Sequence, residues 1–207
     1  MDLGRSLDEG LAALGLDLPV PVRERLLDYV ALLAKWNRVY NLTAVRRPEQ
    51  MIARHLLDSL AVLPYLRPTR ILDVGSGAGL PGIPLALARE DCSFVLLDSN
   101  RKKTRFMTQA AAELGLENVE VVTARIADYR PATPFDTIVS RAYASLDELV
   151  SAACGACAPD GVFLIMKGVY PLAELDALPA GFAVEGVHRL HVPGLDAERH
   201  VVVVRPT

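Results

Sequence analysis

Cysteine is scarce in this chain, which has three in 207 residues. Three thiols cannot form a disulfide framework, and Cys154 and Cys157 have no second C-x-x-C or histidine pair with which to complete a metal site. The alanines around this pair favour a helix of small residues in which both thiols are packed. We therefore expect neither a redox function nor a bound metal.

Long apolar runs are also missing. The longest, such as Val162–Met166 and Val201–Val204, are far shorter than the roughly 18 residues of a membrane-spanning helix. The first ten residues carry acidic side chains early and lack the apolar run of a signal peptide. We therefore expect a cytoplasmic protein without membrane contacts.

Neither sign of charge dominates, since the chain has 22 Lys and Arg and 25 Asp and Glu, which gives a formal net charge of −3. Hydrophobic residues make up 51% of the chain, which excludes the composition of a disordered protein. The length suits one domain with a small appendage. The net charge does not indicate a nucleic-acid-binding protein, but local basic clusters fit local contact with a polyanion.

The first third of the chain has a helical pattern and no convincing strand. Apolar residues recur at helical spacing after the Pro-Val-Pro sequence at 19–21, at Val22, Leu26, Val30 and Leu33. A second helix is predicted to begin at Pro48 and to end at Pro64. We therefore predict a helical N-terminal segment over residues 1–68.

From residue 69 onward, short apolar runs alternate with helical or turn segments. The first five runs are Arg70–Val74, Ser93–Leu97, Val119–Val122, Phe135–Val139 and Gly161–Met166. This alternation is typical of a parallel α/β sheet with both faces covered. The last two runs, Phe182–Val192 and His200–Arg205, have no helix between them. We predict an α/β domain over residues 69–207, with a mostly parallel twisted sheet and an antiparallel C-terminal strand pair.

A glycine-rich loop, DVGSGAGLPG over residues 73–82, follows the first predicted strand and precedes a helix. Gly75, Gly77 and Gly79 allow the backbone to turn sharply and to approach a ligand closely. A dinucleotide fingerprint would need glycine where Leu80 stands, and a Walker loop would need a lysine, which residues 71–89 lack. The G-x-G-x-G spacing after Asp73 is similar to the loop of class I S-adenosylmethionine-dependent methyltransferases.

Further blocks narrow this resemblance. They are KWNRVYNLT at 35–43, RHLLDS at 54–59, LDS at 97–99 and SRAYAS at 140–145, together with the glycine loop extended to Pro84. In this order they resemble the bacterial 16S ribosomal RNA guanine-N7 methyltransferases, the GidB or RsmG family, from about Leu26 to the C-terminus. The resemblance implies a Rossmann-like class I methyltransferase that acts on 16S ribosomal RNA or the small ribosomal subunit, the family's target being the guanine at 16S position 527.

The resemblance also implies the cofactor, S-adenosyl-L-methionine, which leaves as S-adenosyl-L-homocysteine. Its expected binding residues are Gly75, Gly77, Gly79, Leu80, Asp98, Ile126, Ala127 and Arg141. An acid at the position of Asp98 accepts hydrogen bonds from the ribose hydroxyls in this class. Guanine N7 has a free lone pair and no proton to remove, so we assign no catalytic acid or base.

Basic residues mark the expected RNA surface. They are Arg54, His55, Arg101, Lys102, Lys103, Arg141 and Lys167. Ser99 or Asn100 is predicted to cap a helix whose first turn holds three of these cations, where the helix dipole opposes them. The cluster either faces RNA phosphate or is ordinary solvated surface.

Several alternatives remain open at this stage. The chain could be a nicotinamide-dependent dehydrogenase, a non-catalytic nucleotide-binding module that docks on ribosomal RNA, or a methyltransferase acting on another RNA. Nothing in the sequence demands a dimer, and we expect a monomer.

Overall fold

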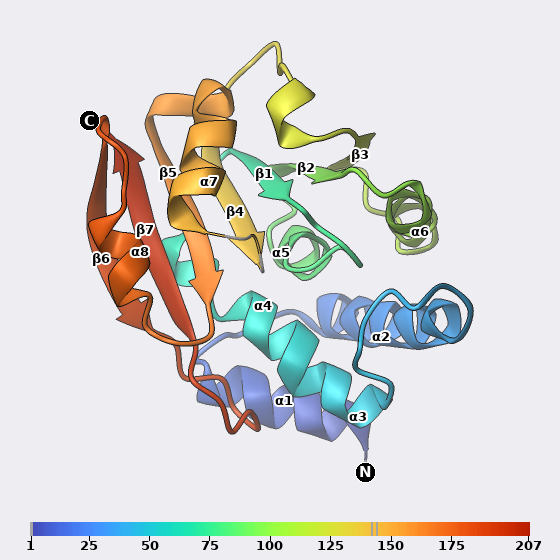
Figure 1. Cartoon of the computed structure of the whole chain (residues 1–207). Helices are drawn as coiled ribbons and strands as arrows, with labels where there is room; N and C mark the ends of the chain where they lie inside the picture. The colour runs from blue at the N-terminus through green and yellow to red at the C-terminus, as the bar shows by residue number, and fades with distance from the viewer. Residues whose placement is uncertain (1, 142, 144) are drawn as a thin grey trace.

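The computed structural model describes residues 2–141, 143 and 145–207. A seven-stranded sheet with the order β3-β2-β1-β4-β5-β7-β6 forms the centre of the molecule (Figure 1). The strands are β1 Arg70–Val74, β2 Ser93–Asp98, β3 Val119–Thr123, β4 Phe135–Arg141, β5 Cys157–Lys167, β6 Phe182–Arg189 and β7 His200–Pro206. Each predicted strand is therefore present.

The pairing of the strands confirms the predicted fold class. β1 pairs in parallel with β2 and β4, and the parallel arrangement continues to β3 on one side and to β5 on the other. β7 runs antiparallel to both β5 and β6, between which it lies. Because the order of the strands reverses between β1 and β4, their carboxyl ends flank the crevice in which open α/β sheets bind ligands.

The first third of the chain is helical and has no strand among its described residues, as predicted, but the helix predicted from Pro48 to Pro64 ends at Leu60 and contains a π-helical turn. The N-terminal segment contains α1 Leu3–Ala13, α2 Val20–Tyr40, α3 Pro48–Met51, the π-helical turn η1 Ile52–Leu57, α4 Asp58–Leu60 and η2 Leu63–Tyr65. The sheet region contains α5 Gly82–Ala88, α6 Arg101–Glu113, η3 Ile126–Asp128, α7 Leu146–Ala153, η4 Cys154–Ala156 and α8 Leu172–Asp176. None of the helices in the described residues combines the length and apolar character that crossing a bilayer requires.

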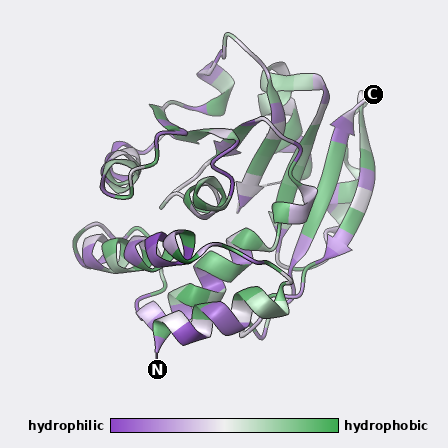
Figure 2. Cartoon of the chain, turned by 180° about the vertical axis from the view of Figure 1, so that it is seen from behind, coloured by the Kyte–Doolittle hydropathy of each residue, from purple (hydrophilic) through white to green (hydrophobic). Residues whose placement is uncertain are grey.

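Two apolar layers, one on each face of the sheet, form the core. On one face α5 lies between the strands and the N-terminal helices, and Leu26 and Leu60 of those helices share a buried cluster with Ile83 and Leu96 (Figure 1). On the opposite face Leu149 and its neighbours in α7 pack on the strands. Figure 2 shows the central strands largely in the hydrophobic colour, whereas the helices carry both colours. The division into two units at residue 68 stays a prediction.

The pair of cysteines corrects one expectation. Helix α7 ends at Ala153, so that Cys154 lies in the short turn η4 and is exposed, whereas Cys157 opens β5 and is buried. Burial raises the pKa of the Cys157 thiol to about 12. The prediction of one small-residue helix with two packed thiols was wrong, because alanine and glycine fit a tight turn at the start of a strand equally well.

Most strand ends lie within two residues of the prediction, but the start of β5 and the end of β6 differ by more. β5 begins at Cys157 rather than Gly161, with a shift of register against β4. β6 ends at Arg189, while the apolar run continues to Val192. Leu190 and Val192 are buried outside any strand, in the loop that leads to β7. An apolar run does not distinguish a strand from a buried loop segment.

Candidate functional site

The glycine-rich loop leaves the carboxyl end of β1 and is held on β2. Gly75, Gly77 and Gly79 have φ angles of 71°, 60° and 83°, a region that side chains with a Cβ rarely adopt. The Gly75 amide donates to the Leu97 carbonyl at 2.8 Å, and the Gly77 amide donates to Asp98 Oδ2 at 2.9 Å. The loop is therefore shaped by its glycines and anchored by its neighbouring strand.

The glycines of this loop differ in what surrounds them and therefore in their structural roles. A Cβ at Gly79 would collide with Ile83, and one at Gly82 would collide with Leu96, so both positions allow α5 to pack closely. At Gly75 the nearest atom to such a Cβ is Tyr143 Cδ2 at 3.9 Å, an ordinary van der Waals contact, so the protein itself does not crowd this position. Close approach of a ligand to the backbone is thus available at Gly75.

Asp73, in strand β1, holds the far end of the glycine-rich loop through a hydrogen bond. It is fully buried, and its Oδ2 accepts a hydrogen bond from the Gly82 amide at 2.9 Å. Its Oδ1 has no partner among the described residues. Burial raises the pKa of this carboxyl to about 7, since the charged form loses its hydration.

A first pocket of about 520 Å³, here called the loop pocket, opens beside Gly75. Its lining residues are Val74, Gly75, Leu97, Asp98, Ser99, Lys103, Ala124, Arg125, Ile126, Ala127 and Tyr143. Four predicted cofactor-binding residues, Gly75, Asp98, Ile126 and Ala127, thus line one pocket. Gly77 and Gly79 belong to the glycine-rich loop but do not line this pocket, and Leu80 is buried in the core at 3% exposure. Arg141 does not line the loop pocket and lies in the pocket next to it.

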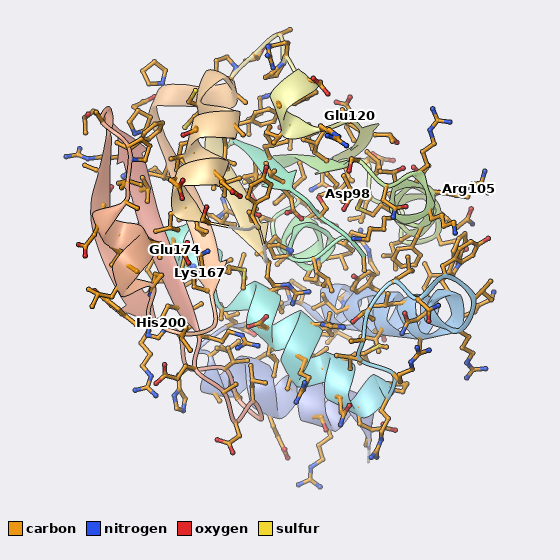
Figure 3. The ribbon with its side chains drawn as sticks, viewed as in Figure 1. Asp98, Arg105, Glu120, Lys167, Glu174 and His200 are labelled. Atoms are coloured by element: carbon orange, nitrogen blue, oxygen red, sulfur yellow. The ribbon has the colours of Figure 1, made fainter. Side chains whose placement is uncertain are left out.

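Asp98 stands at the carboxyl end of β2, at the edge of this pocket (Figure 3). Its two oxygens accept from the amides of Gly77 and Asn100, at 2.9 and 2.8 Å. Lys103 Nζ lies 3.9 Å from Oδ2. A carboxylate accepts about four hydrogen bonds, so Asp98 retains capacity for the hydroxyls of a bound ribose.

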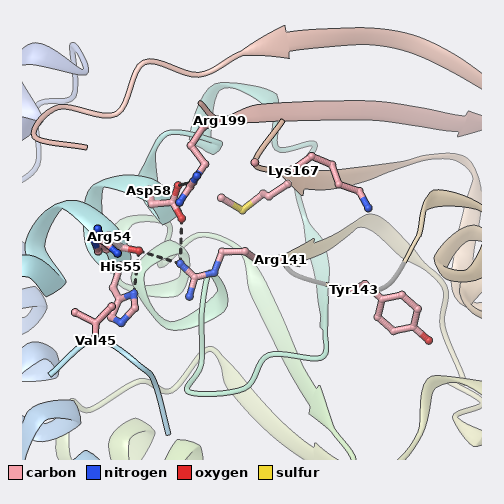
Figure 4. A pocket seen from close by; sticks show the side chains of 10 residues that line it. Val45, Arg54, His55, Asp58, Arg141, Tyr143, Lys167 and Arg199 are labelled. Atoms are coloured by element: carbon pink, nitrogen blue, oxygen red, sulfur yellow. Dashed lines mark hydrogen bonds and ion pairs between the residues drawn. The ribbon is translucent and has the colours of Figure 1, made fainter. Parts of the chain in front are cut away.

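A second pocket of about 440 Å³, here called the arginine pocket, adjoins the first. Figure 4 shows the arginine pocket from close by. Its lining residues are Val45, Arg54, His55, Asp58, Arg141, Tyr143, Met166, Lys167, Gly168 and Arg199. Tyr143 lines both pockets, so they meet at this side chain. The arginine pocket lies over the carboxyl ends of β4 and β5, which contribute Arg141 and Lys167.

A buried carboxylate holds the arginine pocket together. Asp58 is 1% exposed, and its Oδ2 accepts from Arg141 Nη1 at 3.0 Å while its Oδ1 accepts from Arg199 Nε at 2.8 Å. Arg141 Nη1 also donates to the Arg54 carbonyl at 3.1 Å. These bonds join the N-terminal helices to the end of β4 and to the start of β7.

His55 lies in the π-helical turn η1 and is 5% exposed. Burial and the charge of Arg141 lower its pKa to about 4, so the ring is neutral at pH 7. Nδ1 lies 2.8 Å from the Arg54 carbonyl and therefore donates to it, which leaves Nε2 to accept from the Thr43 hydroxyl at 2.9 Å. Both ring nitrogens are engaged within the protein, which favours a positioning role for His55.

The remaining basic residues do not form one surface. Asn100 caps α6 as predicted, and its side chain accepts from the Lys102 amide at 2.9 Å. Arg101 and Lys102 are exposed in the first turn, whereas Lys103 turns back toward Asp98 and lines the loop pocket. Lys167 is paired with Glu174 of α8 at 2.7 Å (Figure 3).

Sequence reasoning assigned no role to several residues of the two pockets, among them Asp58, Tyr143 and Arg199. Asp58 and Tyr143 lie inside the blocks RHLLDS and SRAYAS, so their place in the pattern was visible although no role was assigned to them. Arg199 lies in no motif, and it reaches Asp58 across 141 positions of sequence. In the described residues, no group of three or more His, Cys, Asp or Glu could hold a metal ion.

Solved methyltransferases share this fold. The structure of TrmN from Thermus thermophilus matches with a TM-score of 0.59 and 21% identity, over 83% of this chain and 53% of that one. The ribosomal protein L11 methylase from Lactobacillus delbrueckii subsp. bulgaricus matches with a TM-score of 0.56 and 19% identity, over 73% and 77% of the two chains. The fold is therefore that of a Rossmann-like class I methyltransferase.

The sequence comparisons are more specific. The family model described as rRNA small subunit methyltransferase G matches residues 22–202. The protein of this name from Nitrosococcus oceani is 54% identical over 200 residues, covering 97% of this chain and 94% of the relative. That from Yersinia enterocolitica is 50% identical over 202 residues, covering 97% and 98%. The chain belongs to the rRNA small subunit methyltransferase G family, which confirms the resemblance seen in its motifs.

Proposed function

We propose that this protein transfers a methyl group from S-adenosyl-L-methionine to N7 of a guanine in 16S ribosomal RNA. The observation that carries the proposal is the meeting of the loop pocket and the arginine pocket at Tyr143, at the point where the strand order reverses. One pocket has the features of a nucleoside site and the other has cationic walls. A methyl group passing between two ligands requires such adjacent sites.

The residues of the loop pocket fit the adenosine part of the cofactor. Asp98 would accept from the ribose hydroxyls, and Ile126 and Ala127 would lie against the adenine. Gly75 would leave room for the remaining part of the cofactor next to Tyr143. When bound, the cofactor supplies an electrophilic methyl group on a sulfonium.

The chain's own contribution to the chemistry is positioning. N7 of guanine has a free lone pair and no proton to remove, so it would accept a methyl group from the bound cofactor without a general base. This agrees with the side chains present, because His55 is neutral with both nitrogens engaged and Asp58 is held by two arginines. Orientation of the two reacting groups supplies a large part of the rate enhancement in such reactions.

We further propose that the RNA partner is 16S ribosomal RNA or the small ribosomal subunit, and that the protein works in the cytoplasm as a monomer. A non-catalytic docking module would bind the same partner without transferring a methyl group. The two pockets favour the enzyme over the module, since a docking module has no need of a nucleoside pocket open toward a second cationic one.

The test is transfer of label from tritiated S-adenosylmethionine to small subunits that lack this methylation. We expect stoichiometric label at N7 of one guanine in 16S RNA, identified by nuclease digestion and mass spectrometry. Label on ribosomal protein, on another base or on transfer RNA would contradict the assignment. Binding to subunits without transfer would support the docking module instead.

A further inference from the structure

We propose that Arg199, acting with Arg141, binds the phosphodiester of the guanosine nucleotide that enters the arginine pocket. This inference rests on the proposed function and deepens it. It gives the second pocket a ligand class, a single nucleotide with its backbone phosphate, and it assigns a role to an arginine that lies in no motif.

The first argument is the direction of the two guanidinium groups. Asp58 lies between them and accepts one hydrogen bond from each, at 3.0 and 2.8 Å (Figure 4). Arg199 Nη1 donates in addition to the Glu198 carbonyl at 2.8 Å. Among the described residues, Nη2 of Arg141 and Nη2 of Arg199 have no partner, and both side chains are about one quarter exposed at 23% and 26%. Two oriented groups thus present free donors at the wall of one pocket.

The second argument is the charge of the pocket. The side chains that line it include one carboxylate, that of Asp58, and four basic groups, those of Arg54, Arg141, Lys167 and Arg199. Glu174 neutralises Lys167 from outside the lining, and His55 is uncharged at pH 7. An excess of positive charge therefore remains. Arginine suits this pocket because one nitrogen of each guanidinium group can pair with Asp58 while another donates to a phosphate oxygen.

The third argument is the size and position of the pocket. Its volume of about 440 Å³ lies in the usual range for a small-molecule ligand and is too small for a base-paired helix. A nucleotide could therefore enter only after leaving the base stack. With its phosphate at the arginines, its base would extend toward Tyr143, the side chain shared with the loop pocket.

The alternative role for Arg199 is purely structural. It would then only tie the segment before β7 to Asp58 of the N-terminal helices. Such a role predicts lower stability when Arg199 is changed but no specific effect on RNA. The two roles can be separated because the phosphate role also predicts a change in salt dependence.

The experiment compares Arg199→Gln and Arg199→Lys with Arg205→Gln, an exposed arginine near the far end of β7, the strand that Arg199 precedes. Methylation of small subunits is measured at saturating cofactor and several salt concentrations, with cofactor affinity from calorimetry and melting temperatures alongside. Arg199→Gln should raise KM for subunits by roughly 10- to 100-fold, because charge-assisted hydrogen bonds to the phosphate are removed. The slope of log affinity against log salt should become shallower by up to about 0.9.

The controls define the outcome. Cofactor affinity should remain that of the wild type in all variants, and Arg205→Gln should retain the wild-type KM and salt slope. If Arg199→Gln behaves as Arg205→Gln does, or if it loses cofactor affinity in parallel with KM, the proposal is overturned. If Arg199→Gln does not fold, Arg199→Lys decides. The single nitrogen of lysine can pair with Asp58 but cannot at the same time take the place of the Nη2 donor at the phosphate, so a wild-type KM overturns the proposal.

The failure of this inference is distinguishable from failure of the proposed function. If the wild-type enzyme labels guanine N7 and Arg199→Gln has unchanged kinetics, only the proposed role of Arg199 is contradicted. Wild-type enzyme that labels no RNA would remove the proposed function itself.

Discussion

At the scale of single residues, a few backbone positions and buried groups decide what the loop pocket can bind. Gly75 and Asp98 come together there because the loop after β1 is hydrogen-bonded to the end of β2. The loop in turn rests on Asp73, a carboxyl group fully shielded from solvent. Each of these positions makes a distinct, measurable prediction.

Gly75→Val should abolish cofactor binding. The backbone at this position has a φ angle of 71°, so valine adds strain of roughly 1–2 kcal/mol. Its side chain would also lie against Tyr143, in the part of the loop pocket where we propose that the cofactor binds. Gly15→Val is a matched control, since Gly15 has a φ angle of 69° and nothing within 4 Å of an added Cβ. Both variants should lose similar stability on thermal unfolding, but only Gly75→Val should lose binding in calorimetry. Equal binding in both variants would contradict the placement of the cofactor.

Asp73→Asn should change how stability depends on pH. The pKa of Asp73 in the folded protein is about 7, above the ordinary value of 3.8 for this side chain, so folding favours the protonated form. Its contribution to stability is complete below pH 4 and is lost as the pH rises through 7. The wild type should therefore lose stability relative to Asp73→Asn between about pH 4 and pH 7, with a constant difference above about pH 8. Denaturant unfolding over this range measures it, and a difference independent of pH would contradict the assignment.

At the scale of elements, the first turn of α6 divides its cations between two tasks. Arg101 and Lys102 are exposed, whereas Lys103 lies 3.9 Å from Asp98 and lines the loop pocket. The helical pattern predicted that the three cations would share a turn, but not that Lys103 would line the loop pocket. The single basic cluster inferred from the sequence is therefore two features.

Neutralising the two exposed cations together should affect RNA alone. Changing Arg101 and Lys102 to Gln removes charges that the helix dipole opposes, so the melting temperature should stay the same or rise slightly. The salt slope of RNA binding should become shallower by up to about 0.9 for each phosphate that is no longer bound. Lys103→Gln is the companion variant and should alter cofactor affinity, because Lys103 lies at Asp98. If the double variant and Lys103→Gln change RNA affinity and cofactor affinity to the same extent, this division is contradicted.

The helix over residues 48–60 shows a second effect at this scale. Its apolar spacing predicted a regular helix, but Ile52–Leu57 forms a π-helical turn, which places Arg54 and His55 at the arginine pocket. Local π-helical turns are frequent at functional sites. A pattern of apolar residues does not carry this information, because one extra residue in a turn hardly changes which side chains are apolar.

At the scale of the whole molecule, the N-terminal helices and the sheet share one apolar layer. Leu26 and Leu60 belong to the same buried cluster as Ile83 and Val139. Asp58 binds Arg141 at the end of β4 and Arg199 just before β7. The arginine pocket therefore exists only when both parts of the chain are in place. Its walls come from residues 45–58 and from residues 141–199.

This arrangement predicts a single cooperative unfolding transition for the full chain. A fragment of residues 69–207 should be largely unfolded or aggregated, because the face of α5 that Leu26 and Leu60 cover would be exposed to water. Calorimetry of the full chain and circular dichroism of the fragment are the measurements. Two separated transitions, or a folded fragment that binds S-adenosylmethionine, would instead support two independent domains with the boundary at residue 68.

Local sequence patterns determined most of the fold of this protein and the position of its glycine-rich loop. Alternating apolar runs predict the strands, Asn100 marks the start of α6, and the spacing of Gly75, Gly77 and Gly79 marks the loop. Each depends on residues close together in the chain, whose preferences act on local backbone geometry. The family motifs added the chemistry that those patterns alone left open.

Only the tertiary structure decided which side chains meet in the arginine pocket. Arg141 and Arg199 reach Asp58 across 83 and 141 positions, and the burial that keeps His55 neutral comes from elements that fold over it. Such contacts depend on the order of the strands and on the side from which the N-terminal helices pack. An isolated arginine before a strand carries no local pattern that reveals its partner, so its place beside Asp58 follows from the packing of the whole chain.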